Sequence, residues 1–565
     1  MQDYLRLLEQ YMKVFSFDIF DTCLVRKCGT PSAFFDVLSY KVFVGDVSED
    51  VRRRFVVERK KAMGVACVDD RATLEDIYSV FNFTHPFLVS KEDLVKKELE
   101  CEKLMLVPVL SVKKQIDDLR QKGHKIVFIS DMYLSSDFIK FFLVKYGFFQ
   151  EEDAIYVSCE EGKTKFSGEL YKLIKEREGI EYEDWEHYGD NVHSDLLMAE
   201  RQGIKTHQVC HEYMPYPQKW RNDDFNVGFR SGCVLAGVSR ALHYSEEDNS
   251  HKDFVLDVIA PFYCSLVYKI LYDASKKRIE KLFFCARDAY QMFRIAQREI
   301  VLFPNISVEY VYTSREALYN GDENAKITYF KEIGLASESG SVAIVDTTTS
   351  GLTLNFMNEL LAKHGFKELF GYYFILWDDE RKIDVDVSRG HYELSQSYLT
   401  NVSFRAFWDH IWVFENFFGL NDQKKTIDYE FKDDKAIPVF SDELSVEDCI
   451  MEDNSYWSSI HESLLGRYAD CFVQTELWRF SDELFYHVAI PCLAAFFARP
   501  EKHYLGALVG YRKRDDDNDY IKKESFFRLL RTRGRDSRWK RGTVIYNTPK
   551  WLYDIKSRFN ILKQR

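Results

Sequence analysis

The sequence predicts an α/β protein with two domains built on parallel sheets, followed by a mostly helical C-terminal region. Three observations support this prediction. Short apolar runs alternate with segments of helical period in residues 1–215 and again in residues 225–400. The chain has 565 residues, more than one hydrophobic core supports. Residues 401–565 are rich in aromatic side chains at helical spacing.

Composition excludes several classes of protein. Hydrophobic residues make up 46% of the chain, which is ample for packed cores and argues against extensive disorder. The net charge of -13 argues against general nucleic-acid binding. The 12 cysteines form no CxxC pair, and Met1–Glu9 lacks the pattern of a signal peptide. No apolar stretch is long and uninterrupted enough to cross a bilayer, so we expect a soluble, cytoplasmic protein.

In the first domain, four strand-like runs predict the sheet: Lys13–Phe20, His124–Ser130, Ala154–Ser158 and Trp185–Gly189. Ligands of parallel sheets bind beyond the carboxyl ends of the strands, so Asp18, Ser130 and Asp190 should share one edge. An insert at about 30–106 separates the first two strands. Three of its segments have helical spacing, and we expect a helical lid over the site: Ser48–Met63, Leu74–Phe81 and Lys91–Leu104.

The residues at this edge suit phosphoryl transfer. Asp18 can attack phosphorus and form an aspartyl-phosphate, which divides hydrolysis into two easier steps. A Mg²⁺ ion held by Asp18 and Asp190 would offset the repulsion between carboxylate and phosphate. Ser130 can donate to a phosphoryl oxygen, and Lys165 can neutralise the charge shared by nucleophile and substrate. Asp195 can orient the metal site.

These residues belong to four ordered motifs: Asp18-Ile19-Phe20-Asp21-Thr22, Ser130-Asp131, Lys165, and Gly189-Asp190-Asn191 with Asp195. The set resembles the haloacid dehalogenase (HAD) superfamily of phosphatases over roughly residues 10–210. The resemblance implies a Rossmann-like sheet and Mg²⁺ bound by Asp18, the backbone carbonyl of Phe20 and Asp190, with Asn191 and Asp195 supporting that site. Lys165 is preferred to Lys163 because the residues after it fit the third motif better.

The first motif departs from the family pattern at one position. Phosphatases of the family usually carry the general acid/base Asp two residues after the nucleophile, where this chain has Phe20. An aspartate follows one position later, at Asp21. Either Asp21 takes the proton-transfer role from a shifted turn, or the domain is slow or restricted in substrate.

The second domain should begin after a linker near 211–224, which contains two prolines. A long helical segment, Lys252–Lys276, precedes four strand-like runs: Lys281–Ala286, Ser307–Thr313, Ser341–Val345 and Leu369–Leu376. A Thr/Ser/Gly-rich turn is expected from Asp346 to Thr353, before a helix starting near Leu354. Backbone N–H groups in such turns favour phosphate.

Residues 345–353 resemble the phosphoribosyl pyrophosphate (PRPP) motif of type I phosphoribosyltransferases, and residues 285–289 resemble their pyrophosphate loop. Val345 and Leu352 depart from the family pattern. The residues expected to contact PRPP are Arg287, Asp288, Arg315, Asp346, Thr347, Thr348, Thr349, Ser350, Gly351 and Thr353. The alternative interpretation is a Thr-rich helix cap in an α/β domain.

Residues 401–565 carry no phosphate motif. Their aromatic runs are more typical of a core than of a sugar platform. Glu415 is a candidate for acceptor contact. Arg528–Arg541 is strongly basic, and it is either a solvated face or a contact for an anionic membrane.

The combination of the two domains resembles bacterial polysaccharide-cluster proteins that install ribofuranose on glycans. This resemblance implies transfer of 5-phosphoribose from PRPP to a glycan or lipid-linked glycan, then removal of the 5-phosphate by the HAD domain. The protein would work in the cytoplasm, at the inner face of the membrane if the acceptor is lipid-linked. Two alternatives remain: a sugar-phosphate phosphatase whose C-terminal half only binds the acceptor, and one whose C-terminal half is a partner-binding module.

Overall fold

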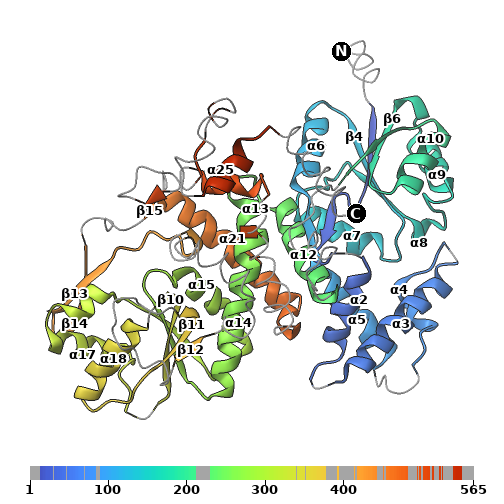
Figure 1. Ribbon diagram of the computed structural model, residues 1–565. Helices are drawn as coiled ribbons and strands as arrows, with labels where there is room; N and C mark the ends of the chain where they lie inside the picture. The colour runs from blue at the N-terminus through green and yellow to red at the C-terminus, as the bar shows by residue number, and fades with distance from the viewer. Residues whose placement is uncertain are drawn as a thin grey trace, which may run out of the picture. The chain divides into compact units, whose positions relative to one another are not determined.

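The computed structural model describes residues 13–210, 229–376, 391–393, 417–441 and 454–480, except 30, 46, 69, 84–88, 339 and 350, together with short pieces between 413 and 549. The chain divides into two compact units (Figure 1). The first comprises Met1–Gln218, Cys233–Glu247 and Gln474–Glu476. The second comprises Lys219–Gly232, Asp248–Val473 and Leu477–Arg565. The predicted linker, 211–224, lies outside the described residues.

The first unit contains a five-stranded parallel sheet in the order β5-β4-β1-β6-β7. The strands are β1 Val14–Asp18, β4 Lys125–Ser130, β5 Ala154–Val157, β6 Trp185–Gly189 and β7 Lys205–Gln208. The helices and helical turns after the lid are α6 Leu110–Gln121, α7 Ser136–Lys145, α8 Ser158–Glu161, α9 Glu169–Glu178, η1 Tyr182–Asp184, η2 Val192–Leu197 and α10 Met198–Gln202. The sequence predicted all strands but β7, because this edge strand is polar and partly exposed.

The insert expected to form the lid consists of helices. They are α2 Pro31–Val42, α3 Glu49–Ala66, α4 Leu74–Ser79 and α5 Lys91–Met105. A short antiparallel pair, β2 Leu24–Arg26 and β3 Leu106–Pro108, joins the two ends of this insert. The chain therefore enters the lid through β2, directly after the first motif, and returns to the sheet domain through β3, which pairs with β2.

A buried ion pair crosses the lid from α3 to α5. The guanidinium of Arg59 donates to Glu98 at 2.6 and 2.8 Å, and both side chains are fully buried. The hydroxyls of Tyr78 and Tyr133 also donate to Glu98, at 2.6 and 3.1 Å. Because Tyr133 follows the second motif, this network connects the lid to the sheet domain.

Helix α12, Phe229–Ser245, groups with the first unit from Cys233 onward. Its buried side chains include Ala236, Val238 and Leu242. The sequence analysis assigned these residues to the start of the second domain, because they follow the expected linker. Helix α12 belongs to the first unit through packing between residues far apart in sequence, and the spacing of apolar residues along the chain does not reveal such contacts.

The second unit contains another five-stranded parallel sheet, in the order β12-β11-β10-β8-β9. Its strands are β8 Lys281–Cys285, β9 Ser307–Val311, β10 Val342–Thr349, β11 Phe370–Leu376 and β12 His391–Glu393. The helices among them are α15 Tyr290–Glu299, η4 Ile300–Leu302, α16 Arg315–Tyr319, α17 Glu323–Glu332 and α18 Leu352–Lys363. One core packs β-strand residues Phe283 and Ile344 against Leu354 of α18. Both predicted parallel sheets are thus present.

Strand β10 is longer than the sequence predicted. It continues through Thr349, and Thr348 and Thr349 pair with Ile375 and Leu376 of β11. The prediction of a turn over Asp346–Thr349 is wrong, because β-branched threonines fit a pleated strand and extend the existing ladder. Helix α18 then starts at Leu352, after Gly351 with a φ of 82°.

The long helical segment of the second unit is continuous over Lys252–Lys276, as α13 Lys252–Phe254, η3 Val255–Ile259 and α14 Ala260–Lys276. Among the described residues it is the one helix long and apolar enough to cross a membrane. However, 94% of its apolar window is buried inside the structure, as is common for the core helix of a soluble protein. Length and composition therefore give weak evidence for a membrane span.

The longest helix in the described part of residues 401–565 is α21, Asn454–Gln474. The other elements are β13 Thr426–Lys432, β14 Lys435–Phe440, β15 Cys449–Ile450, η6 Leu477–Phe480, η8 Tyr504–Leu508, β16 Arg512–Lys513 and α25 Lys540–Asn547. The β13–β14 hairpin was not predicted; its Tyr429 joins the core beside α17. Phe417 and Phe418 are buried, as a core interpretation predicts. Glu415 and most of 528–541 lie outside the described residues.

The lid network predicts a strong effect of Glu98→Ala on stability. The change leaves the buried Arg59 charge without a carboxylate, so the free energy of unfolding should fall by about 3 kcal/mol. Urea denaturation of the two proteins measures this difference. Glu100→Ala, at an exposed position of the same helix, is the control and should change stability by less than about 0.5 kcal/mol. Equal effects of the two changes would contradict a role for the buried pair.

Candidate active site

The four motifs converge where the first sheet reverses its strand order. The chain starts at β1, moves outward through β4 and β5, and then returns to the other side of β1 with β6. Asp18 is the last residue of β1, and Asp190 follows the last residue of β6. In open parallel sheets, the carboxyl ends of two such strands border the crevice that binds ligands.

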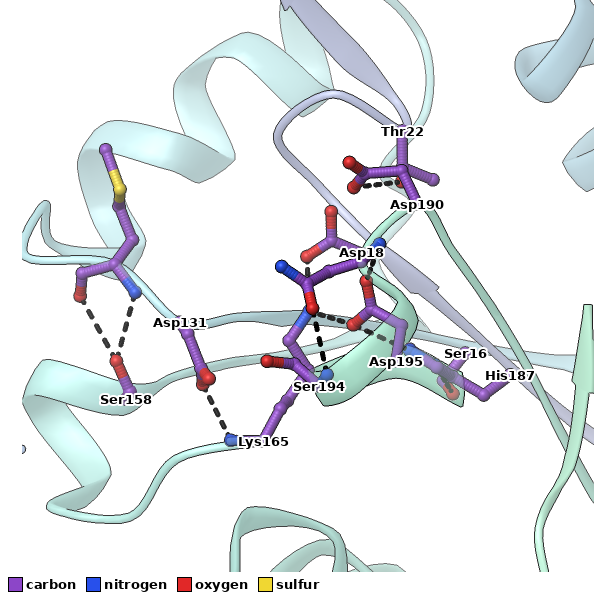
Figure 2. A network of polar contacts seen from close by, with 12 residues as sticks. Ser16, Asp18, Thr22, Asp131, Ser158, Lys165, His187, Asp190, Ser194 and Asp195 are labelled. Carbon is purple, nitrogen blue, oxygen red and sulfur yellow. Dashed lines mark hydrogen bonds and ion pairs between the residues drawn. The ribbon is translucent and has the colours of Figure 1, made fainter. Parts of the chain in front are cut away.

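Lys165 binds two carboxylates in this crevice. Its ammonium group contacts Asp18 and lies 2.6 Å from the Oδ1 atom of Asp195, and all three side chains are buried. No contact of Asp18 or Asp195 with Lys163, two positions earlier, is found among the described residues. Figure 2 shows Lys165, Asp18 and Asp195 as sticks among the neighbouring polar side chains. The contact joins the first, third and fourth motifs directly.

Asp131 holds the loop that carries Lys165. Its carboxylate accepts a hydrogen bond from the backbone N–H of Lys165 at 2.7 Å (Figure 2) and another from the backbone N–H of Phe166 at 3.0 Å. Ser130, the residue before it, is buried at the end of β4, where it was expected. The sequence placed Asp131 in the second motif without a role, and the structure shows that it positions the lysine backbone.

Asp195 is held by its own loop and by β6. Its Oδ2 atom accepts from the N–H of Asn191 at 3.0 Å, and the Asn191 side chain caps the turn η2 by accepting from His193 and Ser194. Gly189 permits this arrangement, since a Cβ atom there would lie 2.3 Å from the carboxyl carbon of Asp195. Asn191 thus orients the fourth motif through the backbone.

A buried chain of hydrogen bonds supports Asp195 from beneath the sheet edge. The Nε1 of Trp185 donates to Ser16 at 2.7 Å, the hydroxyl of Ser16 lies 2.7 Å from Nδ1 of His187, and Nε2 of His187 lies 3.3 Å from Asp195. The sequence analysis assigned no role to His187 or to Ser16. Because side chains alternate between the two faces of a strand, Ser16 on β1 and His187 on β6 both lie under the site. Their contact arises only because the two strands pair.

The carboxylates carry more negative charge than Lys165 balances. Burial raises the pKa of Asp18, the ammonium of Lys165 opposes this shift, and the charges of Asp195 and Asp190 reinforce it. Burial and then the charges of Asp21 and Asp195 raise the pKa of Asp190 to about 7. Although burial opposes both shifts, the charges of Asp18 and then Asp195 raise the pKa of Lys165, and the charge of Lys165 lowers the pKa of Asp195. We therefore take Lys165 and Asp195 as an ionised pair.

This donor set fits Mg²⁺. One carboxylate oxygen from each of Asp18, Asp190 and Asp195 lies within 4.8 Å of the others. Hard oxygen ligands and uncompensated negative charge are what this ion requires. Both oxygens of Asp195 already accept, Oδ1 from Lys165 and Oδ2 from Asn191, whereas Lys165 contacts only Oδ1 of Asp18, so Asp18 and Asp190 are the better ligands. The backbone of Phe20 lies in the turn directly after β1, as the expected third ligand requires.

Asp21 lies at the mouth of the site. Its φ of 57° is in the left-handed region, and its N–H donates to the carbonyl of Leu24 at 2.8 Å. Together with Asp190, it lines a cavity of about 480 Å³. The hydroxyl of Thr22 lies 3.5 Å from Asp190, which joins the first motif to the fourth (Figure 2).

In the second unit, some of the predicted PRPP residues also share a sheet edge. Strand order reverses between β8 and β10, so Arg287 and Asp288, which follow β8, and Asp346 and Thr347, near the end of β10, belong to the same edge of the sheet. The hydroxyl of Thr347 donates to the carbonyl of Asp288 at 3.5 Å, and this side chain is fully buried.

The other predicted PRPP residues are more dispersed. Arg315 starts α16 beyond β9, and Thr353 lies in the first turn of α18. The hydroxyl of Thr349 accepts from the N–H of Gly351 at 3.2 Å. Ser350 and the side chain of Thr348 lie outside the described residues. The structure therefore brings the start of the predicted PRPP motif, at Thr347, next to the loop after β8, at Asp288.

Comparisons with known proteins find similarity among solved structures. No family model matches the chain. No curated protein matches it by sequence. A HAD family enzyme from Bacteroides thetaiotaomicron, solved with magnesium and inorganic phosphate, is 14% identical and matches 36% of this chain and 96% of its own, with a TM-score of 0.28. A HAD phosphatase from Thermococcus onnurineus is 18% identical over 36% of this chain and 87% of its own, with a TM-score of 0.26.

The matched structures belong to the superfamily that the four motifs resemble. At such identities and TM-scores they do not assign chemistry to this chain. The chemical interpretation depends on the side chains that meet at the ends of β1, β4 and β6.

Proposed function

We propose that the first unit hydrolyses a phosphomonoester through a phosphorylated Asp18. The observation that carries this proposal is the buried contact of Lys165 with Asp18 and Asp195, beside Asp190 at the point where the strand order reverses. A carboxylate at that place can act as a nucleophile only if cations offset its repulsion from phosphate. The site supplies one lysine and a donor set for a divalent ion.

In the first step, a carboxylate oxygen of Asp18 attacks phosphorus, and the bond from phosphorus to the leaving oxygen breaks. The leaving oxygen takes a proton from the carboxyl group of Asp21, which lines the same cavity as Asp190. Lys165 and Ser130 stabilise the charge on the phosphoryl oxygens. Mg²⁺ held by Asp18, Asp190 and the Phe20 carbonyl would supply further positive charge for nucleophile and phosphate.

In the second step, water attacks the phosphorus of the aspartyl-phosphate and gives its proton to the carboxylate of Asp21. The bond between phosphorus and the Asp18 oxygen breaks, which releases inorganic phosphate and restores Asp18. The lid restricts the entry of water and substrate, as is common for phosphoryl-transfer sites.

Substitution of the nucleophile should remove this activity. We expect Asp18→Asn to lower kcat/KM for ribose 5-phosphate by about 1,000-fold or more, because the aspartyl-phosphate cannot form. Release of inorganic phosphate measures the rate. EDTA should stop the native protein, and added Mg²⁺ should restore it.

Asp118→Asn, on the exposed face of α6, is the matched control and should turn over at the native rate. Full activity of the Asp18→Asn protein would contradict the proposal. Native activity that persists in EDTA would contradict the metal-dependent form of it.

We further propose that the second unit transfers 5-phosphoribose from PRPP to a hydroxyl of a glycan, after which the first unit removes the 5-phosphate and leaves ribofuranose. The supporting observation is the contact of Thr347 on β10 with the carbonyl of Asp288 after β8, at the edge of the sheet that also carries Asp346 and Arg287. Asp346 would accept from the ribose hydroxyls, and Arg287 would bind pyrophosphate. The alternative is a second unit that binds the acceptor or another partner without catalysis.

A lipid-linked acceptor would place the protein at the cytoplasmic face of the membrane. The basic segment Arg528–Arg541 would then contact anionic headgroups. With a soluble glycan acceptor, the same segment is a solvated basic surface.

Binding of PRPP tests the transferase proposal directly. We expect calorimetry to detect PRPP binding with Mg²⁺ to the Asp18→Asn protein, in which phosphatase turnover is suppressed. A second change, Asp346→Asn, should weaken this binding about 10-fold or more through lost hydrogen bonds to a charged group. Asp433→Asn, in the exposed turn of the β13–β14 hairpin, is the control. No binding by the folded Asp18→Asn protein would exclude a PRPP-dependent transferase.

A further inference from the structure

Helix α12 packs on the first unit at very close range. A Cβ atom added to Gly237 would lie 2.1–2.3 Å from backbone atoms of Cys28 and Gly29, so any larger residue would push the helix away. Cys28 and Gly29 follow β2, at the beginning of the lid. The glycine therefore places α12 directly against the chain that leads from the first motif into the lid.

One turn after Gly237, Arg240 reaches the active site. Its Nη2 atom donates to the carbonyl of Cys28 at 3.4 Å and lies 3.9 Å from the Oδ1 atom of Asp21. Its Nε–H is buried and has no hydrogen-bond partner among the described residues. Both of these contacts involve Nη2, and a guanidinium has five N–H bonds in all, so other donors remain for a further group.

The cavity next to Asp190 is lined by side chains from the sheet, the lid and α12. The lining residues are Asp21, Pro31, Asp190, Gln208, Val209, Cys210 and Arg240. Its volume of about 480 Å³ is in the range of small-molecule sites. Because Asp190 belongs to the phosphoryl-transfer cluster, the cavity extends from the phosphate toward the part of the substrate that leaves.

The chemistry of this cavity suits a polyhydroxylated group. Asp21 accepts hydrogen bonds, Arg240 donates them, and the Gln208 side chain does both. A sugar presents donors and acceptors on adjacent carbons, which such a mixed wall can satisfy. A purely anionic group would meet Asp21 and Asp190, and their charges outnumber that of Arg240.

We propose that Arg240 completes the phosphatase site from outside the HAD-like sheet: it positions the Asp21 carboxyl group and donates to hydroxyls of a sugar leaving group in the cavity beside Asp190. This inference rests on the proposed hydrolysis at Asp18 and gives its substrate class as sugar phosphates. It also accounts for the shifted position of Asp21. A left-handed turn aims that side chain toward α12, and the arginine of α12 contacts it there.

The test compares two substrates in one variant. Ribose 5-phosphate has a sugar leaving group that needs both the cavity and a proton, whereas p-nitrophenyl phosphate has a good leaving group that needs neither. Arg240→Gln should lower kcat/KM for ribose 5-phosphate about 10–100-fold, the loss expected for hydrogen bonds from a charged donor. The loss for p-nitrophenyl phosphate should be at least about 10-fold smaller.

Two further variants separate positioning from simple structural damage. Gly237→Ala displaces α12 without changing any polar group and should show the same difference between the substrates. Arg177→Gln removes an exposed arginine that pairs with Glu161 on the surface, and it should affect neither substrate. Turnover of p-nitrophenyl phosphate by each variant also shows that its active site is folded.

Losses of equal size for both substrates, or no loss for ribose 5-phosphate, would overturn the role of Arg240 while leaving hydrolysis at Asp18 intact. Binding of ribose 5-phosphate to the Asp18→Asn protein, measured by calorimetry with and without Arg240→Gln, gives a second readout. If the native protein hydrolyses neither substrate but this binding still depends on Arg240, the proposed hydrolysis fails and the sugar-phosphate cavity stands. Binding that does not depend on Arg240 would contradict the inference.

Discussion

The site of the first unit depends on two buried ion pairs, which the ammonium group of Lys165 forms with Asp18 and Asp195. A buried cation without a partner is costly, so the carboxylates and the lysine hold one another in the crevice. Asp131 secures the lysine through its backbone, and His187 secures Asp195 through a chain that ends at Trp185. Each strand end thus contributes one part of a single electrostatic cluster. The excess negative charge that remains explains why the donor set suits a divalent cation.

Much of this site could be predicted from the sequence because its parts are local. Apolar runs end at Asp18, Ser130 and Gly189, and the doubly wound arrangement of a parallel sheet brings such ends together. The choice of Lys165 over Lys163 depended only on the residues that follow it. By contrast, the contacts of Ser16 with His187 and of Arg240 with Asp21 join residues about 170 and 220 positions apart. No periodicity or motif reports pairings of this kind.

The second unit shows a different limit of sequence reasoning. A run of threonines is compatible with a phosphate-binding turn and with a strand, and pairing with β11 decides for the strand up to Thr349. Thr347, next to Asp346, still contacts the carbonyl of Asp288 at the point where strand order reverses, which favours a ligand there. Direct geometric support is therefore stronger for phosphoryl transfer in the first unit than for phosphoribosyl transfer in the second.

The most direct test of the account is the chemical identity of the phosphorylated intermediate. The native protein would be mixed with phosphorus-labelled acetyl phosphate and Mg²⁺, quenched in acid and digested, and the labelled peptide would be sequenced by mass spectrometry. If hydrolysis proceeds through a phosphorylated Asp18, the native protein carries a hydroxylamine-sensitive acyl phosphate on Asp18, which is absent from the Asp18→Asn protein. Phosphate on a serine, histidine or another aspartate, or steady turnover without any phosphorylated protein, would contradict it.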